Sequence, residues 1–329
     1  MKKFFVGLFL VAALLLVLLP QPKLSYQKPV WGFSYSPKYA SSLGLDWRQS
    51  YIFLLDELKP ASVRVPLYWD ETETTPRVFS FEPLEFLLAE AHKRNIPVVL
   101  NVGYRVFRYP ECHVPEWAKT LSQHELEDAE RSYLSRVVRY LSETSLAASL
   151  EAIQIENEAR NQLQKNCPPT PYTQLESEGA LFREAFPHIP LVLTWAGDLP
   201  PSDYREYIRY GDIIAVSFFP RRWNHVLHIY DEVFSWGIFS IRHIGRERAT
   251  AEAAGKRFWI SEFEAEPWGE EKETATPERL LDYKKLLDSY GGAERVYLWG
   301  AEWWVWKVQQ GDSTIFEFIK ELTKGNGVQ

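Results

Sequence analysis

Apolar and polar positions follow two different periods along this chain of 329 residues. Short segments rich in Val, Ile and aromatic residues, several with a period of two, predict β-strands. Longer segments with apolar residues three or four positions apart predict amphipathic helices. The predicted strands are residues 31–36, 62–69, 96–104, 150–158, 190–197, 212–220, 256–264 and 295–303. The predicted helices are residues 46–59, 83–95, 125–145, 173–186, 202–211, 225–254, 276–290 and 313–324.

The regular alternation of these segments predicts βαβ units, because neighbouring parallel strands need a long crossover connection. Eight such units in about 300 residues match a closed barrel better than an open doubly wound sheet. We therefore expect the α/β class and a single (β/α)8 TIM barrel over residues 29–329. No glycine-rich G-x-G-x-x-G or Walker motif appears, so the pattern does not favour nucleotide binding. In barrels of this kind the active site lies at the carboxyl ends of the strands.

The first 28 residues form a separate segment. Lys2 and Lys3 precede an apolar run over residues 4–19 that stops at Pro20, which is typical of a signal peptide. At about 1.5 Å per residue the run is short of the ~30 Å hydrocarbon layer. Because no clear small-x-small cleavage site follows, an uncleaved N-terminal membrane anchor is the alternative. We expect an exported protein, extracellular or at the cell surface, with residues 1–28 as leader and short linker.

Composition narrows the choice of partner. The net charge of -7 and the absence of a basic patch argue against nucleic acid. Aromatic residues make up 15% of the chain. These rings could build a large core, or some could stack on the apolar faces of sugar rings in a binding site.

The chain has two cysteines, Cys112 and Cys167, which follow the third and fourth predicted strands. These strands are neighbours in a barrel, and export permits oxidation, so we expect a disulfide that fixes one rim of the cleft. Two cysteines cannot form a structural zinc site alone, and His225 and His228 have no partnering ligand motif. We expect no catalytic metal.

Carboxylates gather at the ends of two predicted strands, the fourth and the seventh. They are Glu156 and Glu158, on either side of Asn157, and Glu262, Glu264 and Glu266. An unpaired carboxylate is costly to desolvate, so acidic ends on apolar strands need a reason. Two carboxyl groups facing each other over a cleft suit acid/base chemistry on a sugar. The alternative is that these loops are simply acidic surface.

Other strand ends supply further candidates for carbohydrate binding. Arg64 could hold a carboxylate in its ionised form, or could serve as an ion pair in the barrel interior. His113 could donate to a sugar hydroxyl, or could pack its loop. Trp299, at the end of the eighth strand, and Trp195, in the fifth, could contact the sugar, with core packing as the alternative.

Asn157-Glu158 at the end of strand four and Ile260-Ser261-Glu262 at the end of strand seven resemble the signature of clan A of retaining glycoside hydrolases. This group of (β/α)8 enzymes includes many cellulases, mannanases, xylanases and β-galactosidases. The resemblance includes the stretch "VRVPLYWDETE" with its arginine at strand two, and Trp299 at strand eight. It extends from about residue 31 to residue 324.

The resemblance implies a role for each matching residue. Glu158 would be the general acid/base and Glu262 the nucleophile, and Asn157 would bind the sugar 2-hydroxyl. No cofactor is implied. If the strand stays extended, Glu156 shares a face with Glu158, so the acid/base assignment could be swapped. Glu266 is the reserve nucleophile.

One departure from the clan lies at the end of strand six, where a tyrosine often hydrogen-bonds the nucleophile and this chain has Phe218 and Phe219. Either another hydroxyl substitutes, or Arg64 alone holds Glu262. The expected activity is cleavage of β-linked oligo- or polysaccharide with retention. The alternatives are a catalytically silent glycan-binding barrel and a transglycosylase. Aromatic-rich loops favour an extended cleft, whereas a wall formed by residues 225–254 would favour exo action.

Overall fold

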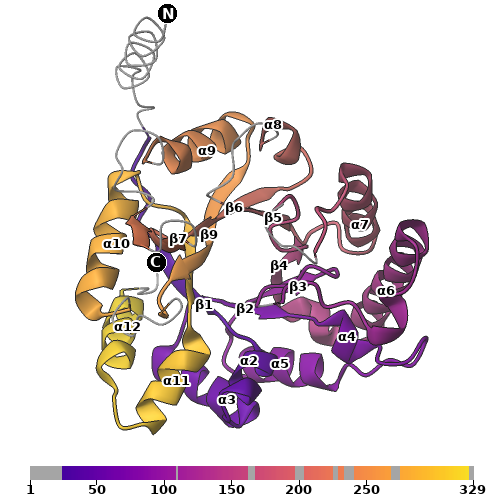
Figure 1. The fold of residues 1–329 in the computed structure, drawn as a ribbon, viewed down its shortest axis with the longest axis horizontal. Coiled ribbons are helices and arrows are strands. Elements are labelled where there is room, and N and C mark those ends of the chain that lie inside the picture. Colours follow the sequence, from indigo (N-terminus) through magenta and orange to yellow (C-terminus); the bar gives the residue numbers. More distant parts are fainter. Residues whose placement is uncertain are drawn as a thin grey trace, which may run out of the picture.

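Eight parallel strands close into a barrel in the order β1-β2-β3-β4-β5-β6-β9-β10. The computed structural model describes residues 24–108, 110–161, 167–196, 204–224, 229–232, 241–267 and 275–325. The barrel strands are β1 (Val30–Ser34), β2 (Val63–Pro66), β3 (Val98–Val102), β4 (Leu150–Ile155), β5 (Leu191–Trp195), β6 (Ile213–Phe218), β9 (Arg257–Glu264) and β10 (Arg295–Trp299). The predicted single (β/α)8 barrel is confirmed (Figure 1).

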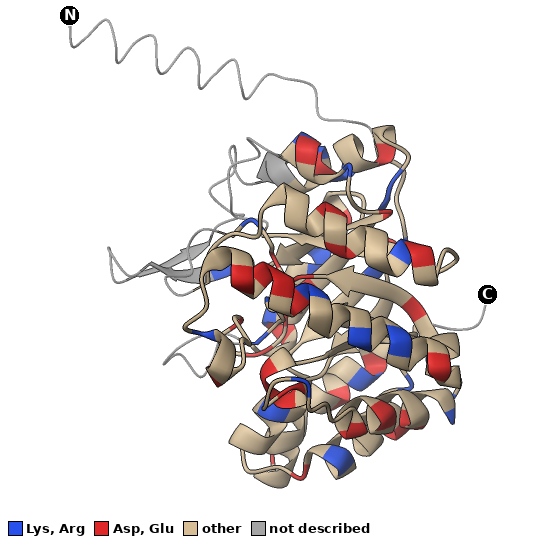
Figure 2. Ribbon diagram, turned by 90° about the vertical axis from the view of Figure 1, so that its right-hand side faces the viewer, with Lys and Arg blue, Asp and Glu red and all other residues tan. Residues whose placement is uncertain are grey.

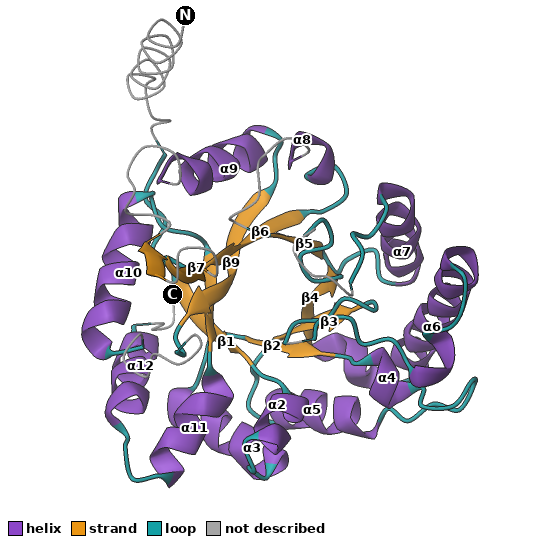
Figure 3. Cartoon of the chain, in the orientation of Figure 1, coloured by secondary structure: helices purple, strands orange, loops and turns teal. Residues whose placement is uncertain are grey.

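Helices surround the barrel on its outside (Figure 3). They are α2 (Pro37–Ser42), α3 (Trp47–Leu58), α4 (Trp69–Thr72), α5 (Glu82–His92), α6 (Gln123–Glu143), α7 (Tyr172–Ala185), α8 (Tyr204–Tyr207), α9 (Ile241–Ala253), α10 (Pro277–Ser289), α11 (Ala301–Gln309) and α12 (Thr314–Lys324). Local sequence explains where several begin. Asp46 accepts hydrogen bonds from the first backbone amides of α3, and Ser122 with Glu125 forms a capping box at α6.

Several predicted boundaries are wrong, including the following three. Residues 225–254 are not one helix, because an antiparallel hairpin of β7 (Arg221–Asn224) and β8 (Ile229–Glu232) precedes α9. The last barrel strand stops at Trp299, since Gly300 has a φ of 124° and α11 follows at once. In the region predicted as helix 202–211, the described helix is the single turn α8. His225 and His228 lie outside the described residues.

Successive side chains along each strand point alternately outward and inward, so the strands contribute to two separate cores. One set of side chains faces the helices, and the other fills the barrel interior with Val99, Ala152, Val192, Ile213, Ala215, Trp259 and Tyr297. Two residues further along several of these strands the interior positions become polar, with Asn101, Gln154, Thr194, Ser217 and Ser261. The carboxyl end of the barrel is therefore the polar end, where a site can form.

Most of the aromatic-rich loops contribute to the core. Trp69 is fully buried and stacks on Tyr133 with ring centroids 5.4 Å apart. Trp304 is also buried, and its indole N–H donates to the carbonyl of Ala265 at 2.7 Å. Core packing is thus the role of these rings, and they do not by themselves indicate an extended cleft.

Charges of both signs are interspersed along the outer helices (Figure 2). Among the described residues, none of the helices has the length and apolar character needed to span a bilayer. The apolar run at residues 4–19 lies outside the described part of the chain. Residues 24–28 lie against the barrel, where Gln27 forms a bridge with Gly292.

Candidate active site

Arg64 is the centre of the polar layer at the carboxyl end of the barrel. It is 1% exposed and lies in β2, where its neighbours in the strand face the helices. One guanidinium nitrogen donates to the Glu262 carboxylate at 3.1 Å, and another to the Asn157 side-chain oxygen at 2.6 Å. Its Nε donates to Gln154 at 2.7 Å. Arg64 was expected either to favour an ionised carboxylate or to form an ion pair in the barrel interior. The two roles are compatible, because its interior ion pair is with the carboxylate of Glu262.

The electrostatics of this group are those of buried, opposite charges. Burial raises the pKa of Glu262, while the charge of Arg64 and its hydrogen bond act in the opposite direction. Burial lowers the pKa of Arg64, and the carboxylates of Glu262 and Glu158 oppose this shift. The Arg64 guanidinium also lies 4.1 Å from the ring centroid of Phe107. These contacts fix the guanidinium plane against the end of the barrel.

A bulge in β9 explains how Glu262 reaches the interior. Val216 pairs with Ile260, but the next residue of β6 pairs with Glu262, so β9 carries an extra residue here. Ile260 and Phe263 both belong to the core that faces the helices. The two residues between them, Ser261 and Glu262, both contact Arg64. The bulge thus turns the Glu262 side chain toward the interior.

The end of β4 breaks the period of two. The strand stops at Ile155, and both Glu156 and Glu158 have positive φ, 55° and 45°. Such values are uncommon for residues other than glycine and cluster at functional sites. The condition under which Glu156 would share a face with Glu158 is therefore not met, because the chain is not extended here.

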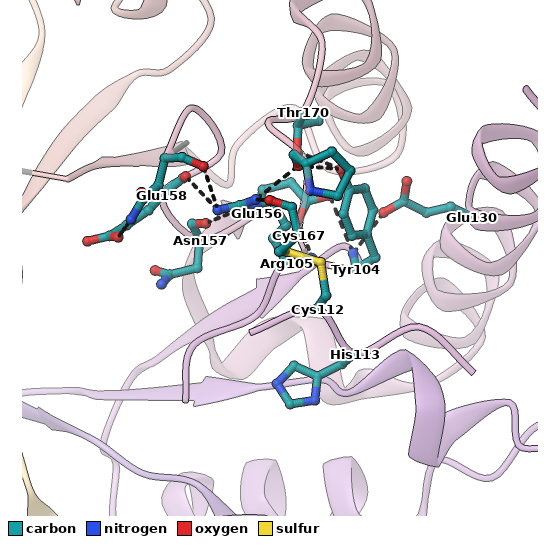
Figure 4. Close-up of a disulfide and its surroundings, with 12 residues drawn as sticks. Tyr104, Arg105, Cys112, His113, Glu130, Glu156, Asn157, Glu158, Cys167 and Thr170 are labelled. Carbon is teal, nitrogen blue, oxygen red and sulfur yellow. Dashed lines mark hydrogen bonds between the residues drawn. A yellow bond between two sulfur atoms is a disulfide. The ribbon is translucent and has the colours of Figure 1, made fainter. Parts of the chain in front are cut away.

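Glu156 turns outward, where its carboxylate accepts hydrogen bonds from the backbone N–H groups of Tyr104 at 3.3 Å and Arg105 at 2.5 Å. Glu158 is 9% exposed and accepts a hydrogen bond from the Asn161 side chain at 2.8 Å. Figure 4 shows Glu158 and Glu130 on opposite sides of Glu156. The geometry separates the two glutamates and leaves Glu158 beside Asn157 on the Arg64 side.

The predicted disulfide between Cys112 and Cys167 is confirmed, with a Cα–Cα distance of 5.4 Å (Figure 4). It joins the loops that follow β3 and β4. Arg105 reinforces the same junction, since it donates to the carbonyl oxygens of Cys167 at 2.7 Å and of Pro168 at 2.9 Å. The rim beside Asn157 and Glu158 is thus covalently tied.

His113 and Trp195 are placed differently from Arg64. His113 is buried, with its ring 4.3 Å from that of Tyr68 and one nitrogen 3.2 Å from the Arg108 carbonyl. This placement fits the loop-packing alternative. Trp195 is 1% exposed and packs against Tyr204 and Tyr207 in the core that faces the helices. The structure does not bring Trp195 to the Arg64 group.

Trp299 and Glu266 lie at the carboxyl end of the barrel around a second arginine. The Arg108 guanidinium is 4.0 Å from the Trp299 ring centroid, and it forms ion pairs with Glu266 and with Glu302, the latter at 2.5 Å. Trp299 also meets the ring of Phe107 edge-on at 5.9 Å. Phe107 in turn contacts Arg64, so the two arginines flank one aromatic cluster.

At the end of β6 the structure answers the question raised by the missing tyrosine. Phe218 is fully buried and stacks on Phe263, with ring centroids 5.4 Å apart. Asn157 supplies the additional contact, since its side-chain hydrogen bond also opposes the raised pKa of Glu262. Arg64 is therefore not alone in holding Glu262.

Sequence reasoning missed Gln154 and Arg108. Gln154 could have been found, because it lies two residues after the interior Ala152 and so faces inward by the strand period. Its amide connects Arg64 to the Asn157 side chain, to which it donates at 3.1 Å. Arg108 and Glu302 lie in a loop and at a helix start, 194 residues apart, and no local pattern links them.

No family model matches this chain, and no curated protein is similar to it in sequence. Its structure nevertheless resembles many solved structures. GH5_18 of Streptomyces cattleya, solved in complex with GlcNAc, is 14% identical with a TM-score of 0.60, over 84% of this chain and 71% of that one. The exo-β-1,4-mannosidase Op5Man5 of Opitutaceae bacterium strain TAV5 is 14% identical with a TM-score of 0.62, over 94% and 63%. The β-galactosidase of the psychrophilic Marinomonas ef1 is 13% identical with a TM-score of 0.62, over 89% and 59%.

The chain spans less than two thirds of the mannosidase and of the galactosidase. Identities this low show a shared fold and do not show a shared reaction. The structural match confirms the resemblance to clan A glycoside hydrolase barrels at the level of the fold. Buried glutamates at the carboxyl end of the barrel are consistent with an active site there.

Proposed function

We propose that this protein is a retaining glycoside hydrolase that cleaves β-linked oligo- or polysaccharide. The observation that carries the proposal is that the Arg64 guanidinium donates hydrogen bonds to both Glu262 and Asn157 at the carboxyl end of the barrel. Asn157 is adjacent in sequence to Glu158, so one buried arginine ties together the ends of strands distant in the chain. Structural similarity to several glycosidases supports the same reaction class.

In this mechanism Glu262 attacks the anomeric carbon. The charge of Arg64 favours the ionised carboxylate against the effect of burial, which is what a nucleophile requires. Glu158 gives its proton to the departing glycosidic oxygen, and a covalent glycosyl-enzyme forms. Glu158 then takes a proton from water, which attacks the same carbon and releases the sugar with retained configuration. Retention requires carboxyl groups about 5–5.5 Å apart.

The first test is to replace the two glutamates separately. Glu262→Gln should abolish turnover. Glu158→Gln should lower kcat by about 10²–10⁴-fold on poor leaving groups and much less on dinitrophenyl glycosides, which need no proton. A panel of nitrophenyl glycosides and insoluble glucans, mannans and xylans would identify the substrate.

A fluorinated glycoside that accumulates the glycosyl-enzyme identifies the nucleophile by peptide mass. A label on Glu262 supports the assignment, while a label on Glu266 would transfer the role to the reserve residue. Binding of glycans without turnover would instead favour a silent binding barrel. Sugar transfer to an added acceptor in place of water, seen by product analysis, would favour a transglycosylase.

Export is part of the proposal, because the basic start and apolar run of the leader are typical of signal peptides. The Cys112–Cys167 disulfide is compatible with an oxidising compartment. Expression of the full chain followed by fractionation and N-terminal sequencing would test it. A mature chain that begins after the apolar run supports a signal peptide, and an intact chain in the membrane fraction supports an anchor.

A further inference from the structure

Three glutamates meet behind the end of β4, on the side of the barrel wall away from Arg64. Glu130 comes from α6, Glu178 from α7 and Glu156 from the residue after β4. All three are buried, and one carboxylate oxygen from each lies within 4.8 Å of the others. In the described part of the chain no lysine or arginine forms an ion pair with any of them.

The neighbourhood of these glutamates contains polar atoms that have no partner. Gln174, also on α7, is 8% exposed and donates its amide N–H to Glu130, while its Oε1 atom is buried without a hydrogen bond among the described residues. Both carboxylate oxygens of Glu178 are also buried without a hydrogen bond among the described residues. Buried acceptors are normally satisfied, so these atoms indicate a missing donor or cation.

A pocket of about 210 Å³ lies between α6 and α7 and connects this cluster to the surface. The buried Glu130, Gln174 and Glu178 line it, and the exposed His124 and Asp128 line it at the surface. The chain also makes room on the barrel side. Gly103 has a φ of 113°, and a Cβ atom there would lie 2.5 Å from the Glu156 carboxyl carbon. The carboxylate of Glu156 is thus seated against the strand end.

We propose that Glu130, Glu156, Glu178 and the amide oxygen of Gln174 bind a hard divalent cation, with Ca²⁺ as the favoured ion. All the donors are oxygens, which Ca²⁺ prefers, and it accepts 6–8 of them at about 2.3–2.6 Å. Ligand atoms within 4.8 Å of one another can all reach an ion at such distances. Water in the pocket would complete the coordination. The cation would balance carboxylates that form no ion pair with a basic side chain in the part of the chain that the structure describes.

Such an ion would join α6, α7 and the end of β4, two residues before Glu158. Its expected effect is on stability and on the rigidity of the turn at Glu156. The inference does not depend on the proposed reaction, since Glu130 lies on the far side of Glu156 from Glu158 (Figure 4).

The test is calorimetric titration of the full chain, freed of metal with EDTA and dialysed, with Ca²⁺ alone. We expect one saturable site and a rise in Tm with Ca²⁺. Glu178→Gln and Glu130→Gln should weaken binding by at least about 10-fold, since each removes a charged ligand. Glu176→Gln is the matched control, because it removes an exposed carboxylate from the same helix and should bind Ca²⁺ as the wild type does.

No saturable binding of Ca²⁺, or wild-type affinity in both cluster variants, would overturn the proposal. The three carboxyl groups would then share protons and hold no ion. Thermal unfolding in EDTA shows whether each variant is folded before its affinity is compared. If Glu178→Gln does not fold, Gln174→Leu provides the same test and should also weaken binding.

Discussion

Two groups of buried glutamates lie on opposite sides of the end of β4, and they differ in what balances their charge. On the inner side, Glu262 is paired with Arg64, and Glu266 with Arg108. On the outer side, Glu130, Glu156 and Glu178 have no ion pair in the described chain. Burial raises the pKa of Glu130 to about 7 and raises those of Glu156 and Glu178 as well.

The comparison shows that burial alone does not identify a catalytic carboxylate. Both groups are desolvated, but one has an arginine whose charge favours the ionised form of a carboxylate, the form a nucleophile requires. The other has no ion pair among the described residues, and its hydrogen-bond donors there are backbone N–H groups and the Gln174 amide, which favours protonation or a bound cation. A single positive φ at Glu156 decides to which group that residue belongs.

The largest effect is expected from Arg64→Leu. This change leaves the Glu262 carboxylate buried without its partner, which typically costs about 3–5 kcal/mol. Urea unfolding of the wild type and the variant measures the loss. The double variant Arg64→Leu, Glu262→Gln should recover part of it, because no charge then remains unpaired.

The control for this prediction is Arg209→Leu. Arg209 pairs with Glu206 at the surface, with its side chain 70% exposed, and its removal should leave stability unchanged. If the double variant unfolded as readily as Arg64→Leu, the lost packing and hydrogen bonds to Gln154 and Asn157 would explain the effect, and the charge would not.

The disulfide lies beside both groups, and its loss ranks second. Replacing Cys112 and Cys167 together by Ser should cost about 2–4 kcal/mol, because the bond closes a loop between positions 55 residues apart. Thermal unfolding with and without a reducing agent measures it. The reductant should lower Tm in the wild type and leave the double variant unchanged. Equal Tm values for both proteins without reductant would contradict a stabilising role.

The sequence predicted the barrel well because its strands and helices each carry a strong period. It also predicted the ion-paired end, since Arg64, Asn157 and Glu262 are adjacent to recognisable strands. It failed where one residue changes direction. Glu156 continues the alternating pattern of the strand, but the strand ends at the residue before it. Nothing about a glutamate side chain predicts the positive φ found there.

The remaining errors have the same origin in backbone geometry and distance. The aromatic residues after Trp299 led to the prediction of a strand up to residue 303, but Gly300 allows the chain to turn and α11 begins at Ala301. The group of Glu130, Glu156 and Glu178 joins three elements through contacts between residues up to 48 apart, and each glutamate alone looks like an ordinary polar position in a helix or a strand end. Contacts of this kind form only when the barrel closes, so no local sequence pattern predicts them.

Glu178→Gln tests the uncompensated side of the comparison. In EDTA near neutral pH the buried Glu178 carboxyl, whose pKa is raised by burial, has to take up a proton on folding, and Gln does not, so this change should raise the free energy of unfolding by about 1–2 kcal/mol. That sign is opposite to the one expected for Arg64→Leu. Urea unfolding in EDTA measures it, with Glu176→Gln as the surface control. A clear loss of stability would mean that Glu178 is satisfied in the metal-free protein.

The smallest effect concerns Glu264, which belongs to neither group. Its carboxyl is buried, one oxygen accepts from the Arg221 backbone N–H at 3.4 Å, and burial raises its pKa to about 8. Because this folded-state pKa lies above the ordinary value, the neutral form is favoured in the fold. Its contribution to stability is complete below about pH 4.5 and is lost as the pH rises through about 8.

Between about pH 6 and about pH 7 one such group lowers the free energy of unfolding by at most about 1.4 kcal/mol. Glu264→Gln cannot lose a proton, so its stability should fall less over this interval than that of the wild type. Glu184→Gln, an exposed change, should follow the wild-type curve. Urea unfolding at both pH values measures the difference. Parallel curves for wild type and Glu264→Gln would mean that the Arg221 amide and nearby cations keep Glu264 ionised, and Glu264 would then belong with the charge-compensated glutamates.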